Sequence, residues 1–258
     1  MLTFPKNVLV LLSHASYFVP DEFRDNLEDY MKANNDRVLK NFSDFGTKFL
    51  ISDEISKDQI IEVGFSRAIG DPNRARNAFD IFRETDFGGL KLWKKPLTED
   101  QKEYLLKNYY DNHHSLIKEK IKELKKEHKN IFVIDIHDTG NLLMGEDYSK
   151  DKLKEVLFPE LALCDSEGFT LNDEIRKVVD KSFRKNLKLE TVWNGPYKYS
   201  FTSSNYADKQ NGVYTLQAEF GRYLLIDEIS QTYNPNVEKL KNPLCKTLTE
   251  IGEYLERL

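Results

Sequence analysis

Residues 131–137 read IFVIDIH, and a second apolar run, NVLVLLS, covers residues 7–13. Continuous apolar runs of this length are typical of strands that are buried on both faces, as in a parallel sheet. We therefore predict that both runs are buried strands. Each run ends at or next to a histidine, which is His14 for the first run and His137 for the second.

The rest of the sequence alternates between segments with a helical pattern and segments with an extended pattern. Amphipathic spacing predicts helices over residues 21–41, 98–128, 171–186 and 237–258. Further strands are predicted over residues 47–51, 60–66, 190–194 and 213–220, although residues 60–66 also suit a short helix. The alternation predicts an α/β fold with a mostly parallel or mixed central sheet flanked by helices. Because the chain shows no internal repeat and no linker, we expect one domain over residues 1–258.

Composition limits the classes of function. The 258 residues are 40% hydrophobic and 31% charged, with a net charge of -5, as in a soluble globular protein. The acidic balance argues against general nucleic-acid binding, which favours a basic face. The two cysteines form no disulfide framework, which favours a reducing compartment. The first apolar run resembles no secretory signal, and none is long enough to cross a membrane. We expect a cytoplasmic protein without nucleic-acid or membrane partners.

The two strand-end histidines point to a metal site. Ligands of parallel α/β sheets bind beyond the carboxyl ends of the strands. Neutral imidazole is a preferred zinc ligand, and a catalytic zinc ion usually takes three protein ligands. Taken singly, His14 or His137 is more often a surface or core residue, whereas the pair at equivalent strand ends favours a metal. A third ligand then has to come from a nearby loop.

Two further segments carry charges that suit a catalytic site. The sequence SRAIGDPNRAR, residues 66–76, places three arginines in a loop rich in glycine and proline. Arginine binds carboxylates through two parallel hydrogen bonds, so this loop is either a pocket for an anion or a solvated loop with ordinary ion pairs. Glu219 ends the apolar run VYTLQAEF, where it is either exposed at an edge or buried as a general base.

The order of these pieces resembles the N-formylglutamate amidohydrolase family. The first strand and its histidine continue as SHASYFVP, and the arginine loop supplies Ser66-Arg67 and the sequence DPNR. The other matching pieces, in chain order, are SDFGT, YYDNHHSLI, DIH, WNGPYK and QAE. The resemblance runs from about residue 7 to residue 228. It implies the phosphorylase/hydrolase-like fold of the zinc carboxypeptidases.

The resemblance also implies roles for individual residues. It makes His14, Asp44 and His137 the zinc ligands, with Asp53 and Glu54 as competitors for the position of Asp44. Glu219 is implied as the general base and Arg67 as the group that stabilises the oxyanion. The residues implied to bind the substrate are Asn73, Arg74, His113 and Lys198.

Together these inferences predict zinc-dependent cleavage of the amide bond of an N-acyl amino acid, such as N-formylglutamate. The chain departs from the family at Ala15-Ser16 and Tyr199-Ser200, where glycines are usual. These larger side chains keep two related enzymes open as alternatives, a carboxypeptidase-like hydrolase and a deacylase for another N-acyl group. A metal-free module that binds small anions is the alternative of a different class.

Overall fold

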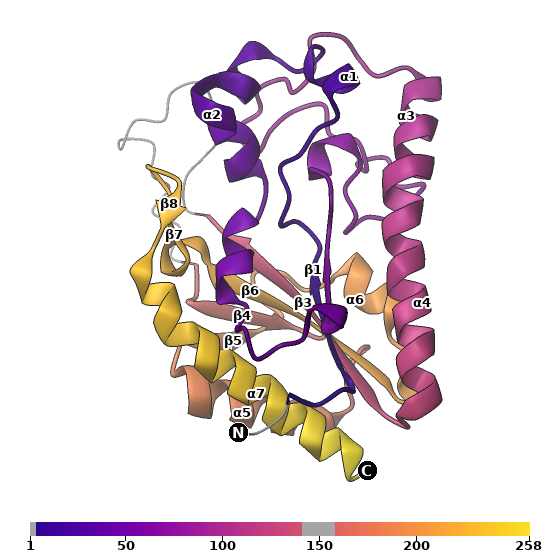
Figure 1. Ribbon diagram of the computed structural model, residues 1–258, viewed down its shortest axis with the longest axis vertical. Coiled ribbons are helices and arrows are strands. Elements are labelled where there is room, and N and C mark those ends of the chain that lie inside the picture. The colour runs from indigo at the N-terminus through magenta and orange to yellow at the C-terminus, as the bar shows by residue number, and fades with distance from the viewer. Residues whose placement is uncertain (1–3, 141–157) are drawn as a thin grey trace.

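A computed structural model describes residues 4–140 and 158–258 of the chain. A sheet of six strands, in the order β2-β1-β3-β6-β4-β5, forms its centre (Figure 1). The strands are β1 (Val8–Leu12), β2 (Ile60–Glu62), β3 (Ile131–Thr139), β4 (Leu161–Cys164), β5 (Thr191–Trp193) and β6 (Val213–Gly221). A separate two-stranded ribbon joins β7 (Ile226–Asp227) to β8 (Thr232–Tyr233).

The sheet is mixed, with a parallel half and a reversed half. β1 is parallel to both β2 and β3, and β3 is parallel to β6. β4 runs antiparallel to β6, and β5 runs parallel to β4. The predicted α/β class with a mostly parallel or mixed sheet is therefore confirmed. The carboxyl ends of β1, β3 and β6 meet at one edge of the sheet.

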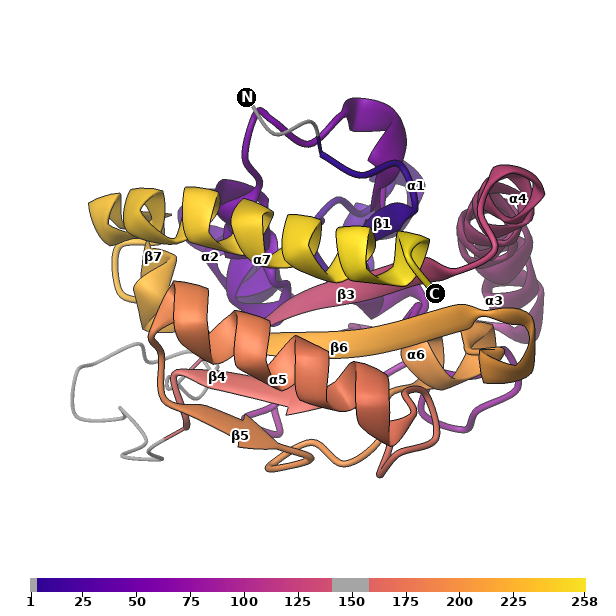
Figure 2. The same cartoon turned by 90° about the horizontal axis from the view of Figure 1, so that it is seen from below.

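Helices cover both faces of the sheet. The helices are α1 (Asp21–Arg24), α2 (Asp29–Phe42), α3 (Glu99–Leu105), α4 (Asp111–Glu127), α5 (Asp173–Leu187), α6 (Phe201–Tyr206) and α7 (Glu238–Glu256). Figure 2 shows α5 and α7 side by side over one face, where they bury the side chains of Phe132 and Leu216. The opposite face buries Val133 and Val213 against α4 and α6. Because neighbours in a strand point to opposite faces, both faces of β3 and β6 are apolar, as the continuous runs predicted.

The predicted elements agree with the structure in most places. The long helix over residues 98–128 forms as α3, a π-helical turn over Leu106–Tyr110, and α4, and Thr98 and Gln101 make the predicted capping box. The expected helix over residues 21–41 is divided into α1 and α2, and Ala33–Asp36 leave helical geometry inside α2. The strand predicted over residues 60–66 is limited to β2.

One strand prediction is wrong, and three strands and one helix were not predicted. The expected strand over residues 47–51 belongs to a 3₁₀ helix, Phe45–Leu50, because the backbone closes i to i+3 hydrogen bonds there, from Thr47 to Asp44 and from Ile51 to Lys48. The unpredicted strands are β4, β7 and β8, and the unpredicted helix is α6.

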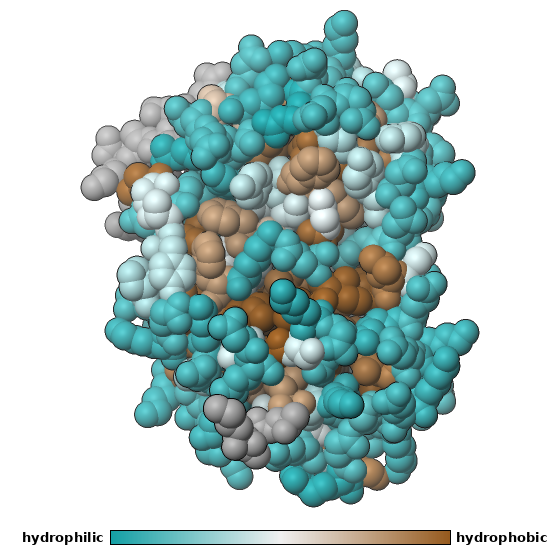
Figure 3. Space-filling view, viewed as in Figure 1, coloured by the Kyte–Doolittle hydropathy of each residue, from teal (hydrophilic) through white to brown (hydrophobic). Residues whose placement is uncertain are grey.

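A second apolar cluster lies above the edge of the sheet at which the carboxyl ends of β1, β3 and β6 meet. It packs α2 and the last residue of α3, Leu105, against residues of the segment 63–97, among them Phe65, Ile69 and Trp93. Hydrophilic residues cover most of the face that Figure 3 shows, and hydrophobic ones reach the surface mainly across its middle. In the described ranges, no helix is long and apolar enough to cross a membrane.

Candidate active site

Three strand ends bring the site together. His14 follows β1 by two residues, His137 lies near the end of β3, and Glu219 lies near the end of β6. Since these strands are parallel neighbours, their carboxyl ends share one edge. His137 and Glu219 are directly paired in the register of β3 and β6. The apolar runs therefore carry the polar side chains to the same point.

His14, Asp44 and His137 form a buried cluster. The two imidazole rings have their centroids 4.8 Å apart and meet edge to face. Asp44 Oδ2 lies 3.4 Å from His14 Nδ1 and 2.9 Å from His137 Nδ1. One ligand atom of each residue lies within 4.8 Å of the other two, which is a spacing that suits a metal ion. The structure thus brings together the three residues that the sequence suggested as ligands.

The backbone around Asp44 explains why this residue joins the histidines. The amide of Asp44 donates to the carbonyl oxygen of His14 at 2.8 Å, so the loop after α2 is tied to the loop after β1. Asp53 and Glu54, the competing candidates, are both exposed and lie outside the cluster. Glu54 is directed instead toward the thiol of Cys245, with Oε2 at 3.7 Å from Sγ.

Each imidazole of the cluster also faces an outer carboxylate. His14 Nε2 lies 2.7 Å from Asp71 Oδ1, and His137 Nε2 lies 2.9 Å from Asp135 Oδ2. Carboxylates behind metal-binding histidines fix the tautomer and the orientation of the ring. With both Nε2 atoms directed outward, both Nδ1 atoms face Asp44. Asp71 and Asp135 are parts of the quoted sequence pieces, but the sequence alone assigned them no role.

Burial and the neighbouring charges shift the pKa values of two carboxylates in the site, Asp44 and Glu219. Burial acts to raise the pKa of Asp44, but its hydrogen bond with His137 and the charges of His14 and His137 outweigh this effect and hold that pKa far below its usual range. Burial raises the pKa of Glu219, and the charge of Asp44 adds to this effect, while His137 opposes it. A carboxylate with a raised pKa is better suited to accept a proton than an ordinary surface glutamate.

A chain of hydrogen bonds fixes the orientation of Glu219. Thr139 Oγ1 donates to Glu219 Oε2 at 2.9 Å, and Gln217 Nε2 donates to Oε1 at 3.0 Å. Gln217 Oε1 in turn accepts from Asn73 Nδ2 at 3.1 Å. The side chain of Asn73 is held from its other end by the amide of Thr202, which donates to Oδ1 at 2.9 Å. Asn73 is therefore linked to the carboxylate of Glu219 through one intervening side chain.

The arginines of the loop over residues 66–76 have different surroundings. Arg67 is nearly buried and donates to Asp71 Oδ2 through Nε at 3.1 Å and Nη2 at 2.6 Å. Gly70, with φ of +133°, lets the backbone turn between these two partners in a conformation that side chains disfavour. Arg74 is partly exposed, and its Nε lies 2.8 Å from Asp80 Oδ2. Arg67 thus adjoins the histidine cluster through Asp71, whereas Arg74 faces an acidic partner at the surface.

The two remaining predicted residues lie at different depths. His113 is buried on α4, its ring meets Phe65 edge to face at 6.1 Å, and its Nε2 has no hydrogen-bond partner in the described part of the chain. Lys198 is exposed on the segment between β5 and α6. Tyr197, which the sequence did not suggest, lies closer to the centre, because Thr139 Oγ1 also contacts its hydroxyl at 3.2 Å. Burial and the charge of Glu219 raise the pKa of Tyr197 to about 12.

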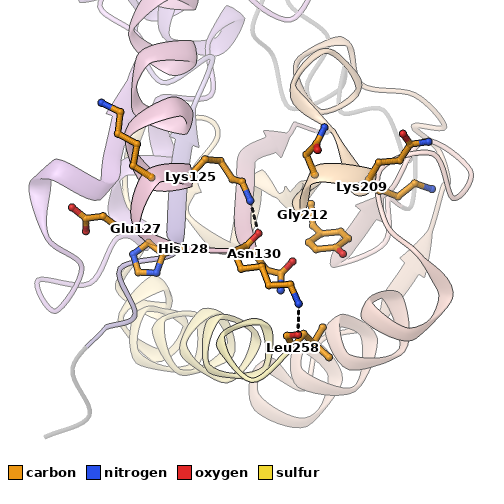
Figure 4. Close-up of a pocket in the computed structure, with 12 residues that line it drawn as sticks. Lys125, Glu127, His128, Asn130, Lys209, Gly212 and Leu258 are labelled. Carbon is orange, nitrogen blue, oxygen red and sulfur yellow. Dashed lines mark hydrogen bonds between the residues drawn. The ribbon is translucent and has the colours of Figure 1, made fainter.

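A hollow of about 570 Å³ lies at the other end of the strands (Figure 4). Asn130 and Gly212, which precede β3 and β6, line it together with lysines from α4 and from the turn before β6. Three of the four lysines that line it donate to backbone carbonyls: Lys125 Nζ to that of Lys129, Lys129 Nζ to that of Leu258 at 2.8 Å, and Lys209 Nζ to that of Gly168 at 2.7 Å. Within the described ranges this hollow holds no group of metal-ligating side chains like the cluster at the opposite edge.

The sequence profile of the N-formylglutamate amidohydrolase family matches residues 6–226, a span that contains every residue of the site described above. The chain belongs to this family. Membership makes it a hydrolase that acts on an amide bond. No curated protein matches the sequence significantly.

Two solved structures share the fold of this amidohydrolase. The N-formylglutamate amidohydrolase from Ralstonia eutropha JMP134 is 18% identical, with a TM-score of 0.71, and the alignment covers 100% of this chain and 98% of that one. A gene product of Agrobacterium tumefaciens is 16% identical, with a TM-score of 0.67 and coverage of 97% and 92%. At these identities the likeness establishes the fold, and the site of this amidohydrolase has to be argued from its own residues.

Proposed function

We propose that this amidohydrolase uses zinc to cleave the amide bond of an N-acyl amino acid, with N-formylglutamate as the first candidate. The observation that carries the proposal is the buried cluster of His14, Asp44 and His137 beside Glu219. A metal-free anion-binding module would give no reason to bury two imidazoles against three carboxylates. The family name supplies the candidate substrate.

The residues of the cluster fit a zinc ion. Zinc takes nitrogen and oxygen ligands at about 2.0–2.2 Å in tetrahedral geometry, which places neighbouring ligand atoms roughly 3.3 Å apart. The separations of 3.4 and 2.9 Å between Asp44 Oδ2 and the two Nδ1 atoms are close to this value. The buried His14 Nδ1 has no hydrogen-bond partner in the described chain. An unsatisfied buried nitrogen costs free energy that a bound cation removes.

In the proposed mechanism the protein moves protons and stabilises charge around the scissile amide. Zinc bound by the cluster supplies a Lewis acid, which polarises the amide carbonyl and lowers the pKa of water. Glu219 accepts a proton from the attacking water and returns it to the amine nitrogen as the C–N bond breaks. Arg67 Nη1, which makes no hydrogen bond within the described chain, stabilises the negative charge that develops on the carbonyl oxygen.

The remaining predicted residues bind and orient the substrate. Asn73 and Arg74 hold the carboxylate next to the scissile amide, which lines the bond up with Glu219. His113, buried on α4, and Lys198, exposed on the segment before α6, are the other two residues in the proposed substrate site. We further propose that residues 1–258 form one domain, that the enzyme acts in the cytoplasm and that its partners are small anionic substrates. Two buried free thiols, Cys164 and Cys245, agree with a reducing compartment.

Metal analysis tests the proposal. We expect about one zinc per chain in the wild type and a loss of that zinc in His137→Ala, because one of three ligands is removed. His128→Ala is the matched control, since His128 lies at the end of α4 and pairs with Glu256 instead. Hydrolysis of N-formylglutamate should follow the zinc content. A folded wild type that holds no metal and takes up none from added zinc would show that the proposal is wrong.

A further inference from the structure

Arg83 differs from the other arginines of the segment 67–83. Arg67 pairs with Asp71 and Arg74 pairs with Asp80, while Arg76 is held by two carboxylates, those of Glu103 and Asp111. Arg83 is partly buried, yet it makes no ion pair with any residue in the ranges 4–140 and 158–258. A partly buried guanidinium without a carboxylate is costly, because burial removes water and no opposite charge compensates for the loss.

An aromatic ring connects Arg83 to the active site. The Cζ atom of Arg83 lies 4.6 Å from the centre of the Phe87 ring, and the Cζ atom of Arg67 lies 5.3 Å from the same centre. Phe87 is 47% exposed, so the ring is open to solvent between the two cations. Arg67 in turn adjoins His14 through Asp71. Arg83 therefore lies on the outer rim of the site, one aromatic ring away from Arg67.

The backbone that carries Arg83 and Phe87 is well fixed. Leu92 donates to the carbonyl oxygen of Glu84 at 2.9 Å, and the amide of Asp86 donates to that of Leu90 at 2.8 Å. The indole of Trp93 also donates to the carbonyl oxygen of Arg83 at 3.3 Å. In Figure 1 this segment lies between α2 and α3, above the carboxyl edge of the sheet. A ligand that binds here meets a preformed surface, so little conformational entropy is lost.

The charges around Arg83 favour an anion. Burial lowers the pKa of Arg83, and the neighbouring positive charges of Arg67 and Arg74 lower it further. Arginine nevertheless remains protonated in proteins, so the site keeps an excess of positive charge. The only contact of its guanidinium nitrogens in the described chain is one from Nε to the carbonyl oxygen of Thr85, at 3.3 Å. Neither Nη atom makes a hydrogen bond to residues 4–140 or 158–258, so both can bind a carboxylate.

We propose that Arg83 binds a second carboxylate of the substrate, the one on the side chain of an N-acyl acidic amino acid. This inference rests on the proposed function, in which Asn73 and Arg74 hold the first carboxylate. Phe87 provides an apolar surface for the methylene groups between the two carboxylates. Arg83 is thereby the residue that makes the enzyme prefer a dicarboxylate over a neutral N-acyl amino acid.

Kinetics with an isosteric pair of substrates test this inference. N-formyl-L-glutamate and N-formyl-L-glutamine have the same shape and differ in one charge. We expect the wild type to prefer the glutamate substrate in kcat/KM and Arg83→Met to lose about 10- to 100-fold of that preference, mainly through KM, since a charge-assisted bond to the substrate is lost. Activity on the glutamine substrate should fall far less, because the neutral side-chain amide forms no charge-assisted bond with Arg83. Arg76→Met, in the same segment, is the matched control and should keep the wild-type preference.

Calorimetric titration of the holoenzyme with L-glutamate and L-glutamine separates failure of this inference from failure of the proposed function. If the wild type hydrolyses N-formyl amino acids but Arg83→Met keeps the full preference for glutamate, the inference is wrong and the function stands. If the wild type hydrolyses none of them, the proposed function is wrong, and the titrations decide the role of Arg83. Tighter binding of glutamate that depends on Arg83 then supports an anion site, and equal binding of both ligands overturns it.

Discussion

His137 and Glu219 are directly opposite each other on the adjacent parallel strands β3 and β6. Both side chains leave the sheet on the face covered by α4 and α6. His137 lies four residues after Val133 and Glu219 six after Val213, and residues an even number of positions apart on a strand point to the same face. A proposed metal ligand and the proposed base are thus held by two rigid strands that are hydrogen-bonded to each other. Sites built on strands hold their geometry better than sites built on loops.

Replacing the proposed base should separate catalysis from metal binding. We expect Glu219→Gln to lower kcat on N-formylglutamate by about 10²- to 10⁴-fold, because the amide cannot accept a proton. Its zinc content should equal that of the wild type, since Glu219 is not in the metal-ligand cluster. Glu253→Gln on α7 serves as a control that should change neither value. Full activity of Glu219→Gln would assign the base to another residue.

Arg222 should act as a positioning residue for the proposed ligand Asp44. Its Nη1 and Nη2 atoms donate to the carbonyl oxygens of Asn41 and Ser43 at 2.7 and 2.8 Å, and its Nε binds Asp138. We expect Arg222→Met to weaken zinc binding by about 10- to 100-fold, because the loop that presents Asp44 loses its anchor. Competition with a chelator measures this change.

The stability of the same variant needs its own control. Removing Arg222 leaves the buried Asp138 without its cation, which should lower the free energy of unfolding by about 3–5 kcal/mol. Adding Asp138→Asn should recover part of that stability in urea denaturation while zinc affinity stays low. Arg184→Met, which breaks an exposed pair with Asp180, should cost under about 1 kcal/mol. Restored zinc affinity in the double variant would mean that Arg222 acts only on stability.

The sequence predicted the elements that have strong local patterns. The apolar runs of β1 and β3 identified the strand ends, and with them His14 and His137, because continuous burial needs continuous apolar residues. β4 was missed because its four residues are too few to show a pattern. The run over residues 47–51 has strand-like residues, but its backbone forms local turns beneath α7.

The parts of the site that the sequence could not assign depend on contacts between distant segments. Asp44 was chosen over Asp53 and Glu54 by family likeness, and the physical reason, the hydrogen bond from the Asp44 amide to His14, exists only in the folded chain. Arg222 binds carbonyl oxygens that lie about 180 residues away, at separations of 181 and 179. Backbone carbonyls carry no sequence signal, so no pattern around Arg222 could indicate this role.

Stability at acidic pH should depend on His114. Its Nε2 lies 3.1 Å from the carbonyl oxygen of Pro72, which can only accept, so Nε2 carries the proton and Nδ1 accepts from the hydroxyl of Tyr206. Burial lowers the pKa of His114 from 6.5 to about 4. Between these two pH values the unfolded chain binds a proton that the folded chain does not, so the free energy of unfolding rises with pH. As the pH falls from about 6.5 toward 4, the free energy of unfolding decreases by up to roughly 3 kcal/mol. Urea denaturation at several pH values, with a chelator present to exclude metal release, should show a shallower loss for His114→Gln than for the wild type. Equal slopes for the two proteins would mean that His114 is not held neutral in the fold.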